Sequence, residues 1–219
     1  MISLSEENYL KAIYQEVQLK ETASTNSIAL RLNTKPASVS EMLHKLSDKK
    51  LIKYKPYQGV NLTDKGQRLA LTVIRKHRLW EYFLVNNLNF KWDEVHSIAE
   101  QLEHIQSDKL IEKLSSYLGN PKFDPHGDPI PDKNGKIHNL NAKPLGDYKK
   151  GSKLILCAVS QSEDLFLQYL DSLGLKIGAT ILLKDFISFD GSLHILINNK
   201  TSAFIGSGIA NNLLVSKYE

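Results

Sequence analysis

The stretch 76–109 constrains this chain most, because it carries three of the seven histidines together with several glutamates at helical spacing. His77 and Glu81 are four residues apart. A helix turns by about 100° per residue, so these two side chains share one helix face. Taken alone, such a pair is more often a weak surface contact than a metal site.

A second set of candidate ligands follows in the same stretch. The positions i, i+4, i+7 and i+8 of a predicted helix over 92–106 are occupied by His96, Glu100, Glu103 and His104. On a buried face, two imidazoles and two carboxylates cost free energy unless a cation neutralises them. Imidazole and carboxylate are ligands of first-row divalent metals. Together, the two sets therefore predict metal binding by neighbouring helices.

The bulk composition bounds the class of protein. A chain of 219 residues suits two domains or one large one. Its first residues are amphipathic and acidic, so we expect no signal peptide, and no apolar run is long enough to cross a membrane. The single cysteine, Cys157, favours a cytoplasmic protein. The net charge of +4 is compatible with nucleic-acid binding but is not evidence for it.

The first 63 residues have the pattern of a winged helix-turn-helix. Three helices are predicted over 4–18, 25–33 and 36–51, and two short strands around a turn follow within 51–63. Hydroxyls and lysines at the start of the third helix and in the wing suit contacts with phosphates and base edges. The expected DNA-contacting residues are Lys35, Pro36, Ser38, Ser40, Glu41 and Lys45 on the helix, with Tyr57 and Gln58 in the wing.

A block of aromatic and aliphatic helices follows, predicted from residue 63 to Gly119. It exceeds what a small winged-helix domain can bury, so we expect dimerisation. A twofold dimer also suits the reading of paired half-sites on DNA.

The remaining chain changes character twice. Residues 120–147 are rich in Pro, Gly, Asp and Asn, and there we expect a turn-rich linker with solvated histidines at His126 and His138. The last 70 residues predict a strand, a short helix and three or four more strands, which is typical of a small SH3-like β-barrel. The fold class is thus mainly α with a small β part. The predicted domains are 1–63 for DNA binding, 64–119 for metal binding and dimerisation, 120–147 as linker and 148–219 as the barrel.

Three segments carry a resemblance to a known family: RKHRLWEYFL, VHSIAEQLEHIQSD and PHGDPIP. The winged helix and the C-terminal part extend this resemblance over almost the whole length of the chain. The family that the chain resembles is the diphtheria-toxin-repressor/manganese-transport-regulator family. The resemblance implies a metal-dependent transcriptional repressor whose C-terminal SH3-like domain is of FeoA type.

The resemblance also implies two metal sites. Their ligands would be His77, Glu81 and His96, with Glu163 or Asp164, in one site, and Asn8, Glu100, Glu103 and His104 in the other. The chain departs from the family at two positions of the first helix. Asn8 is neutral where manganese-type members have a carboxylate, and Lys11 stands where such members can have an acid.

The oxygen and nitrogen ligands, without thiolate, favour Mn(II), with Fe(II) as the alternative, and one or two ions per subunit. We expect a homodimer that represses metal-uptake genes by binding a palindromic double-stranded DNA operator, without contact with a membrane. Two alternatives stay open at this point. One is a winged-helix regulator that responds to a small organic ligand, and the other is a dinuclear metallohydrolase.

Overall fold

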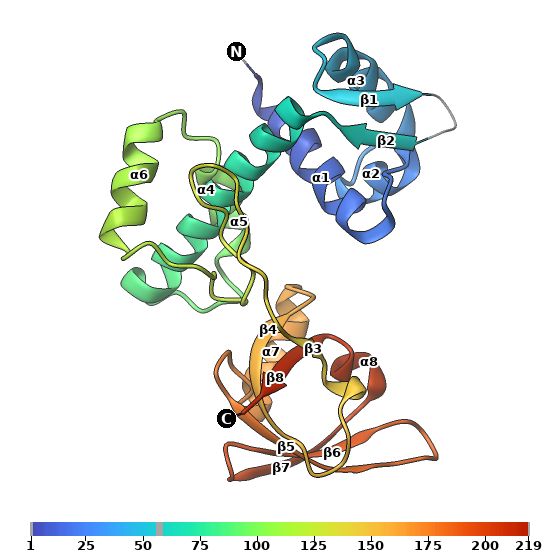
Figure 1. Cartoon of the computed structure of the whole chain (residues 1–219), viewed down its shortest axis with the longest axis vertical. Helices are drawn as coiled ribbons and strands as arrows, with labels where there is room; N and C mark the ends of the chain where they lie inside the picture. Colours follow the sequence, from blue (N-terminus) through green and yellow to red (C-terminus); the bar gives the residue numbers. More distant parts are fainter. Residues whose placement is uncertain (1, 56–58, 219) are drawn as a thin grey trace. The chain divides into compact units, whose positions relative to one another are not determined.

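The computed structural model describes residues 2–55 and 59–218 (Figure 1). They fall into two compact units. Tyr57 and Gln58, expected in the wing, lie outside the described residues. The first unit comprises Met1–His77, Glu100–Lys113 and Pro131–Ile137, and the second comprises Arg78–Ala99, Leu114–Ile130 and His138–Glu219.

Helix α1 (Leu4–Lys20) opens the first unit with a capping box. The side chain of Ser3 accepts from the backbone N–H of Glu6 at 3.3 Å, and the Glu6 carboxylate accepts from Ser3 N–H at 2.9 Å. These two bonds satisfy donors that a helix start leaves unpaired. Leu10 and Ile13 are fully buried on the inner face of α1, and each stabilises the fold by about 1.5–3 kcal/mol through burial.

A winged helix-turn-helix follows, which confirms the fold expected for the N-terminal region. Val39, Leu43 and Leu46 lie at helical spacing on the third helix and share one core with α1. In the antiparallel hairpin, Ile52 pairs with Leu62. The elements are α2 (Thr25–Arg31), α3 (Pro36–Asp48), β1 (Ile52–Lys55) and β2 (Gly59–Leu62).

Three further helices are α4 (Asp64–Leu88), α5 (His96–Leu102) and α6 (Asp108–Tyr117). The Thr63 hydroxyl caps α4, because it accepts from the N–H of Gly66 at 3.2 Å. Helix α5 is shorter than the helix predicted over 92–106. Glu103 and His104 therefore lie in a turn after α5, and their expected place on one helix face with His96 is wrong.

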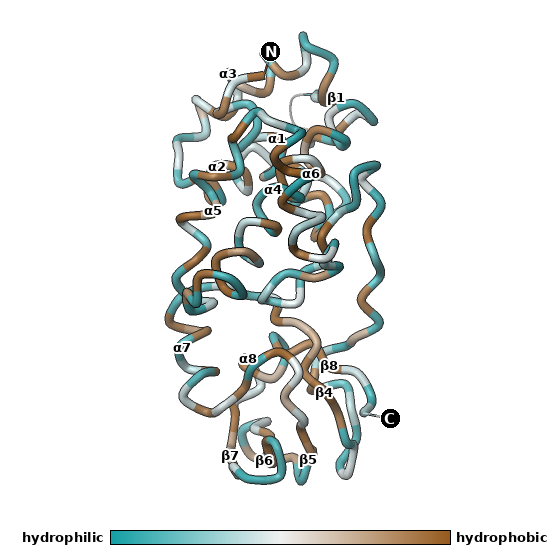
Figure 2. Tube along the Cα trace, turned by 90° about the vertical axis from the view of Figure 1, so that its left-hand side faces the viewer, coloured by the Kyte–Doolittle hydropathy of each residue, from teal (hydrophilic) through white to brown (hydrophobic). Residues whose placement is uncertain are grey.

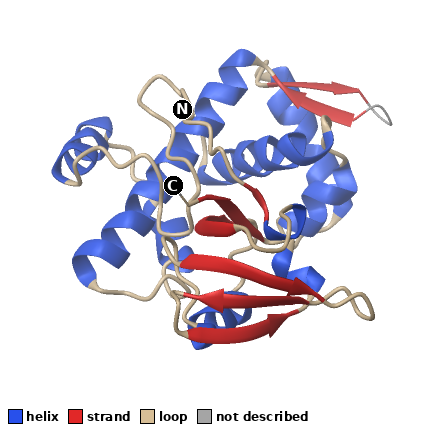
Figure 3. Cartoon of the chain, turned by 60° about the horizontal axis from the view of Figure 1, so that its bottom comes forward, coloured by secondary structure: helices blue, strands red, loops and turns tan. Residues whose placement is uncertain are grey.

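The second unit contains one antiparallel sheet of six strands in the order β3-β8-β4-β5-β6-β7, seen as a curved sheet in Figure 3. The elements are β3 (Lys143–Pro144), η1 (Leu145–Asp147), β4 (Lys153–Val159), α7 (Asp164–Leu173), β5 (Thr180–Phe186), β6 (Leu193–Ile197), β7 (Thr201–Ile205), α8 (Ser207–Ala210) and β8 (Leu213–Lys217). The expected α-rich architecture with a small C-terminal β part is thereby confirmed.

The core of this sheet follows from the alternation of its side chains. Leu193, Ile195 and Ile197 are buried on β6, whereas the residues between them are half-buried. Hydrophobic residues run along β4 and β5 in Figure 2. Helix α7 adds Leu167 and Leu170 to the same core, so α7 packs against the sheet.

Candidate metal centre

Helix α1 presents two charged side chains, Glu7 and Lys11, one turn apart on one face. The ammonium of Lys11 lies 2.6 Å from Oε2 of Glu103 and 3.3 Å from Nδ1 of His77. Nδ1 of His77 lies 2.6 Å from the same glutamate oxygen. Lys11 is 8% exposed, His77 6% and Glu103 1%. The three groups therefore form a buried network within the first unit.

Glu7 makes a second connection between α1 and the turn after α5. Its Oε2 lies 2.7 Å from Nδ1 of His104, and its Oε1 accepts from the side-chain amide of Gln106 at 2.9 Å. The face of α1 that carries Glu7 and Lys11 is thus tied to residues 103–106 through two carboxylates, that of Glu7 on α1 and that of Glu103 in the turn after α5.

The charge state of Glu103 follows from its neighbours. Burial by itself raises the pKa of a carboxyl group. At Glu103 the hydrogen bond from His77 and the positive charges of Lys11 and His77 outweigh burial, and the pKa of Glu103 lies below its ordinary value. Glu103 is therefore an anion whose counter-charge comes from side chains of this chain.

Asn8 and Glu100, which were expected to bind a metal together with Glu103 and His104, are both exposed. Asn8 is exposed and lines a groove of the first unit together with Ser38, Glu41 and Lys45 of α3. Glu100 is exposed on the last turn of α5, whereas Glu103 is buried. Their roles as ligands stay predictions from the sequence.

The other expected site centres on Glu81 of α4, which is 3% exposed. Within the second unit, its Oε1 lies 3.3 Å from Nδ1 of His96, the first residue of α5. His77 precedes Glu81 by one turn of the unbroken helix α4. His77, Glu81 and His96 form one of the groups that could hold a metal ion.

A second group of possible ligands also uses Glu81, together with Asp124 and His126, and all three side chains are buried. One ligand atom of each lies within 4.8 Å of the others. Oε2 of Glu81 lies 3.8 Å from Nδ1 of His126. Nε2 of His126 donates to the carbonyl of Trp92 at 2.8 Å, which aims Nδ1 at the carboxylates, as in many metal-ligating histidines.

The backbone of residues 124–128 builds this second group. Oδ1 of Asp124 accepts from the N–H of His126 at 2.8 Å and of Asp128 at 2.9 Å. Gly127 has φ +87°, and a Cβ there would lie 2.1 Å from the carbonyl oxygen of Cys157. Only glycine therefore lets this turn lie so close to β4. The prediction that His126 is solvated is wrong, since it is 3% exposed.

The pKa values of this group reflect an excess of carboxylates. Burial, Asp128 and Glu81 together raise the pKa of Asp124 to about 7. Burial favours the neutral form of His126, but Glu81 and Asp124 outweigh it and raise the pKa of His126 to about 9. Protons thus balance the carboxylates near neutral pH, and a cation could take their place.

The C-terminal region contributes two acidic side chains, Asp164 and Asp171, to a pocket near this centre. Asp164, the first residue of α7, lines a pocket of the second unit together with His96. Gln168 of α7 donates to Oδ2 of Asp93 at 2.9 Å and so holds the two segments together. Glu163 is the exposed N-cap residue of α7 and is not among the residues that line this pocket.

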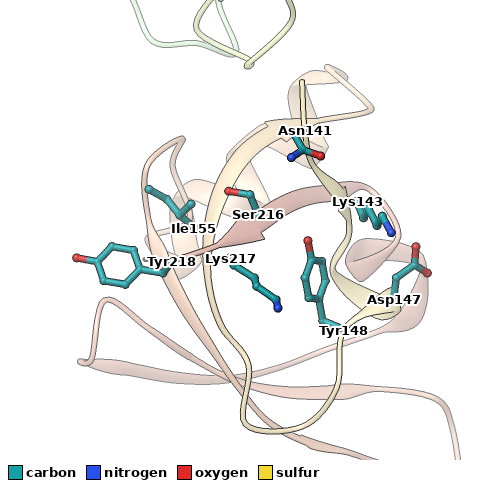
Figure 4. Close-up of a pocket in the computed structure, with 8 residues that line it drawn as sticks. All are labelled: Asn141, Lys143, Asp147, Tyr148, Ile155, Ser216, Lys217 and Tyr218. Atoms are coloured by element: carbon teal, nitrogen blue, oxygen red, sulfur yellow. The ribbon is translucent and has the colours of Figure 1, made fainter. Parts of the chain in front are cut away.

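A different pocket lies against β8 and η1 of the second unit (Figure 4). Lys143, Tyr148 and Lys217 line it, and among the described residues Asp147 is the one acidic side chain of its lining. Histidine and cysteine are missing from its lining, so this pocket lacks a set of metal ligands.

The expected DNA-contacting residues lie together at the exposed start of α3. Lys35 is the N-cap residue without a side-chain hydrogen bond to the helix, and Pro36 is the first helical residue. Backbone N–H groups at such a helix start can bind phosphate. Ser38 and Glu41 are exposed, the Ser40 hydroxyl donates to the carbonyl of Pro36, and Lys45 lies 3.3 Å from Glu6.

Three family models match consecutive parts of the chain. Residues 1–60 match the N-terminal DNA binding domain of the iron dependent repressors, and residues 63–132 match their metal binding and dimerisation domain. Residues 143–217 match the FeoA domain. Within the described residues, no helix is both long and apolar enough to span a membrane.

Individual relatives agree with these matches. The iron-dependent repressor IdeR of Mycobacterium tuberculosis is 36% identical over 125 residues, which are 57% of this chain and 54% of the relative. The chain thus spans about half the length of this relative. The diphtheria toxin repressor of Corynebacterium glutamicum is 26% identical over 97% of this chain and 96% of its own length. A solved manganese-dependent transcriptional repressor in complex with manganese has a TM-score of 0.88 and 33% identity, covering 97% of this chain and 100% of that one.

Proposed function

Because the chain belongs to the family of iron-dependent repressors, which includes the diphtheria toxin repressor and manganese-dependent repressors, we propose that it is a cytoplasmic repressor activated by Mn(II) or Fe(II). It binds a palindromic operator in double-stranded DNA as a homodimer and controls metal-uptake genes. The family consists of DNA-binding regulators and not of enzymes, which argues against a metallohydrolase.

The observation that carries this proposal is the position of the Glu81 carboxylate between two imidazoles. Its oxygens face His96 at 3.3 Å and His126 at 3.8 Å. The proposed centre is built around Glu81, and its candidate ligands are His77, His96, Asp124, His126 and Asp164. A bound divalent cation would replace the protons that balance these buried carboxylates near neutral pH. Oxygen and nitrogen donors without a thiolate suit Mn(II) or Fe(II).

The proposed domains follow the expected boundaries. Residues 1–63 bind DNA, with α3 in the major groove and its N-terminus against a phosphate. Residues 64–119 form the dimer and carry the candidate ligands His77, Glu81 and His96. Residues 120–147 link the domains and add Asp124 and His126, and residues 148–219 form the SH3-like domain, which adds Asp164. The metal binding and dimerisation model that matches 63–132 supports the homodimer.

In the proposed switch, metal binding restricts the motion of the two DNA-binding domains of the dimer. Without a metal ion, protons balance the carboxylates around Glu81, and no shared ligand ties together the segments that carry them. With a metal ion bound to these side chains, the two α3 helices of a dimer are held at a spacing that fits successive major grooves. An allosteric coupling of about 1–3 kcal/mol corresponds to roughly a 5- to 150-fold change in DNA affinity.

Fluorescence anisotropy with a labelled palindromic operator tests the proposal. Mn(II), anaerobic Fe(II), Zn(II) and chelator are compared at one fixed salt concentration, because phosphate contacts make affinity salt-dependent. We expect Mn(II) or Fe(II) to tighten binding and chelator to reverse the effect. Binding that chelator leaves unchanged would refute metal activation and favour a regulator that responds to an organic ligand.

A further inference from the structure

The buried Lys11–Glu103–His77 network lies where the resemblance to the family led us to expect a second metal site. Glu103 is 1% exposed, and both groups that contact its Oε2 at 2.6 Å belong to this chain. The carboxylate therefore already has a counter-charge in the ammonium of Lys11. A divalent cation bound to the same oxygen would lie close to that ammonium and be repelled by it. The residues present do not fit a second metal here.

The network also determines which nitrogen of His77 can bind a metal. Nδ1 lies 2.6 Å from the Glu103 carboxylate, a distance that assigns a proton to Nδ1. Nε2 is then the nitrogen whose lone pair is suited to a metal. Histidine ligands are commonly oriented in this way by a carboxylate on the opposite ring nitrogen.

Lys11 connects this histidine to the DNA-binding domain. Helix α1 shares its core with α3, since Leu10 and Ile13 cluster with Leu43 and Leu46. Glu7, one turn before Lys11, contacts His104 on the same side. A shift of His77 or Glu103 would therefore be transmitted to α3 through a rigid helix.

We propose that Lys11 replaces a second metal ion and acts as a positioning residue that couples the metal centre to the DNA-binding domain through Glu103 and His77. In this arrangement Glu103 orients His77 and is not a metal ligand. The inference rests on the proposed function, because it assigns the residues that transmit metal binding to DNA.

Two measurements on the purified full-length chain test this assignment. Isothermal titration calorimetry counts the Mn(II) ions bound per protomer, and operator anisotropy gives the ratio of DNA affinities with and without Mn(II). Glu103→Gln should bind as many Mn(II) ions as the wild type, about 10- to 100-fold more weakly, because its role is to orient a ligand. Loss of one ion from Glu103→Gln would overturn the proposal.

Lys11→Met tests the coupling. It should bind the same number of Mn(II) ions but show less than a twofold effect of Mn(II) on DNA affinity. Lys11→Arg retains the cation and should keep the wild-type ratio within about threefold. Lys20→Met, an exposed lysine on the same helix, is the matched control and should behave as the wild type.

A full Mn(II) effect in Lys11→Met would overturn this inference alone. A wild type without any Mn(II) effect would overturn the proposed function as well. Should Lys11→Met fail to fold, shown by its circular dichroism spectrum, the ion count of Glu103→Gln and the affinity ratio of Lys11→Arg still decide the question.

Discussion

Oε2 of Glu81 lies 3.8 Å from Nδ1 of His126, although one residue belongs to a helix and the other to a loop beyond the helical block. The other oxygen of the same carboxylate faces His96. A centre built around Glu81 therefore draws on three separate segments of the chain. The loop at 124–128 is held in place by its own hydrogen bonds and by the Gly127 turn against β4.

His126→Ala should weaken Mn(II) binding at least tenfold, which corresponds to about 1.4 kcal/mol. The substitution deletes an imidazole and leaves Glu81 and Asp124 with less counter-charge in a buried site. Isothermal titration calorimetry measures the change. His138→Ala, an exposed histidine of the same turn-rich region, is the control and should change nothing. An affinity within twofold of the wild type for His126→Ala would show that this imidazole is not a ligand.

The sequence could pair His77 with Glu81 by helical spacing, whereas only the resemblance to the family grouped His96 with them. It could not predict His126, since a tract rich in Pro, Asp and Asn normally lies in solvent. What buries this histidine is a contact between Gly127 and β4, which are distant in the chain. The one local indication of this site was the sequence of residues 124–128, in which His126 is followed directly by Gly127 and the pair lies between two aspartates.

Asn8→Ala tests whether the side-chain amide of Asn8 is a metal ligand, as the family resemblance implies. The exposed side chain lines a groove with Ser38 and Glu41 of α3. We therefore expect Mn(II) affinity within twofold of the wild type and a loss of operator affinity of about 1 kcal/mol, typical of one hydrogen bond. Calorimetry and anisotropy on the same protein measure the two quantities. Weaker Mn(II) binding would instead support the role that the family resemblance implies.

Lys35→Ala tests the phosphate contact proposed for the start of α3. Loss of one phosphate contact should weaken binding to all DNA sequences alike and reduce the slope of log affinity against log salt by about 1. Operator anisotropy over a series of salt concentrations measures that slope. Lys200→Ala removes the same charge from an exposed position after β6 and should leave the slope as it is. An unchanged slope in Lys35→Ala would place Lys35 away from the DNA.

The winged helix was predictable because each of its signals is local. Pro36 begins α3, apolar residues recur at helical spacing, and Val60 alternates with polar neighbours in the hairpin. The end of α5 was not predictable, because residues 103–106 contain no glycine or proline to stop a helix. The helix ends where Glu103 and His104 contact α1. These are tertiary contacts, which the sequence does not reveal.

Leu110→Glu should shift the proposed homodimer toward monomer. Leu110 and Tyr117 lie seven residues apart on one face of α6, and they are 42% and 70% exposed. A buried charge in an apolar interface is costly, so we expect a lower dimer fraction by sedimentation equilibrium with an unchanged circular dichroism spectrum. Leu19→Glu, at an exposed leucine of α1, serves as the control. Equal dimer fractions for both variants would exclude this face of α6 from the interface.

Glu6 should make the stability of the chain sensitive to acid. Burial raises the pKa of Glu6, but hydrogen bonds from Lys49, Ser3 and Lys45 lower it to about 2, against an ordinary value of 4.5. Because the folded pKa is the lower one, this stabilisation is present above pH 4.5 and is lost as the pH falls from 4.5 to 2. The side chains of Lys45 and Lys49 are 54% and 40% exposed, so solvent screening limits the effect to about 1 kcal/mol.

Urea unfolding of the wild type and of Glu6→Gln at pH 7 and pH 3 checks this. The wild type should be more stable than the variant at pH 7 by about 1 kcal/mol, and most of that difference should vanish at pH 3, because the carboxyl group then loses its advantage over the neutral amide. The far-ultraviolet circular dichroism signal follows the helices during unfolding. An equal difference at both pH values would mean that the charge of Glu6 does not stabilise the start of α1.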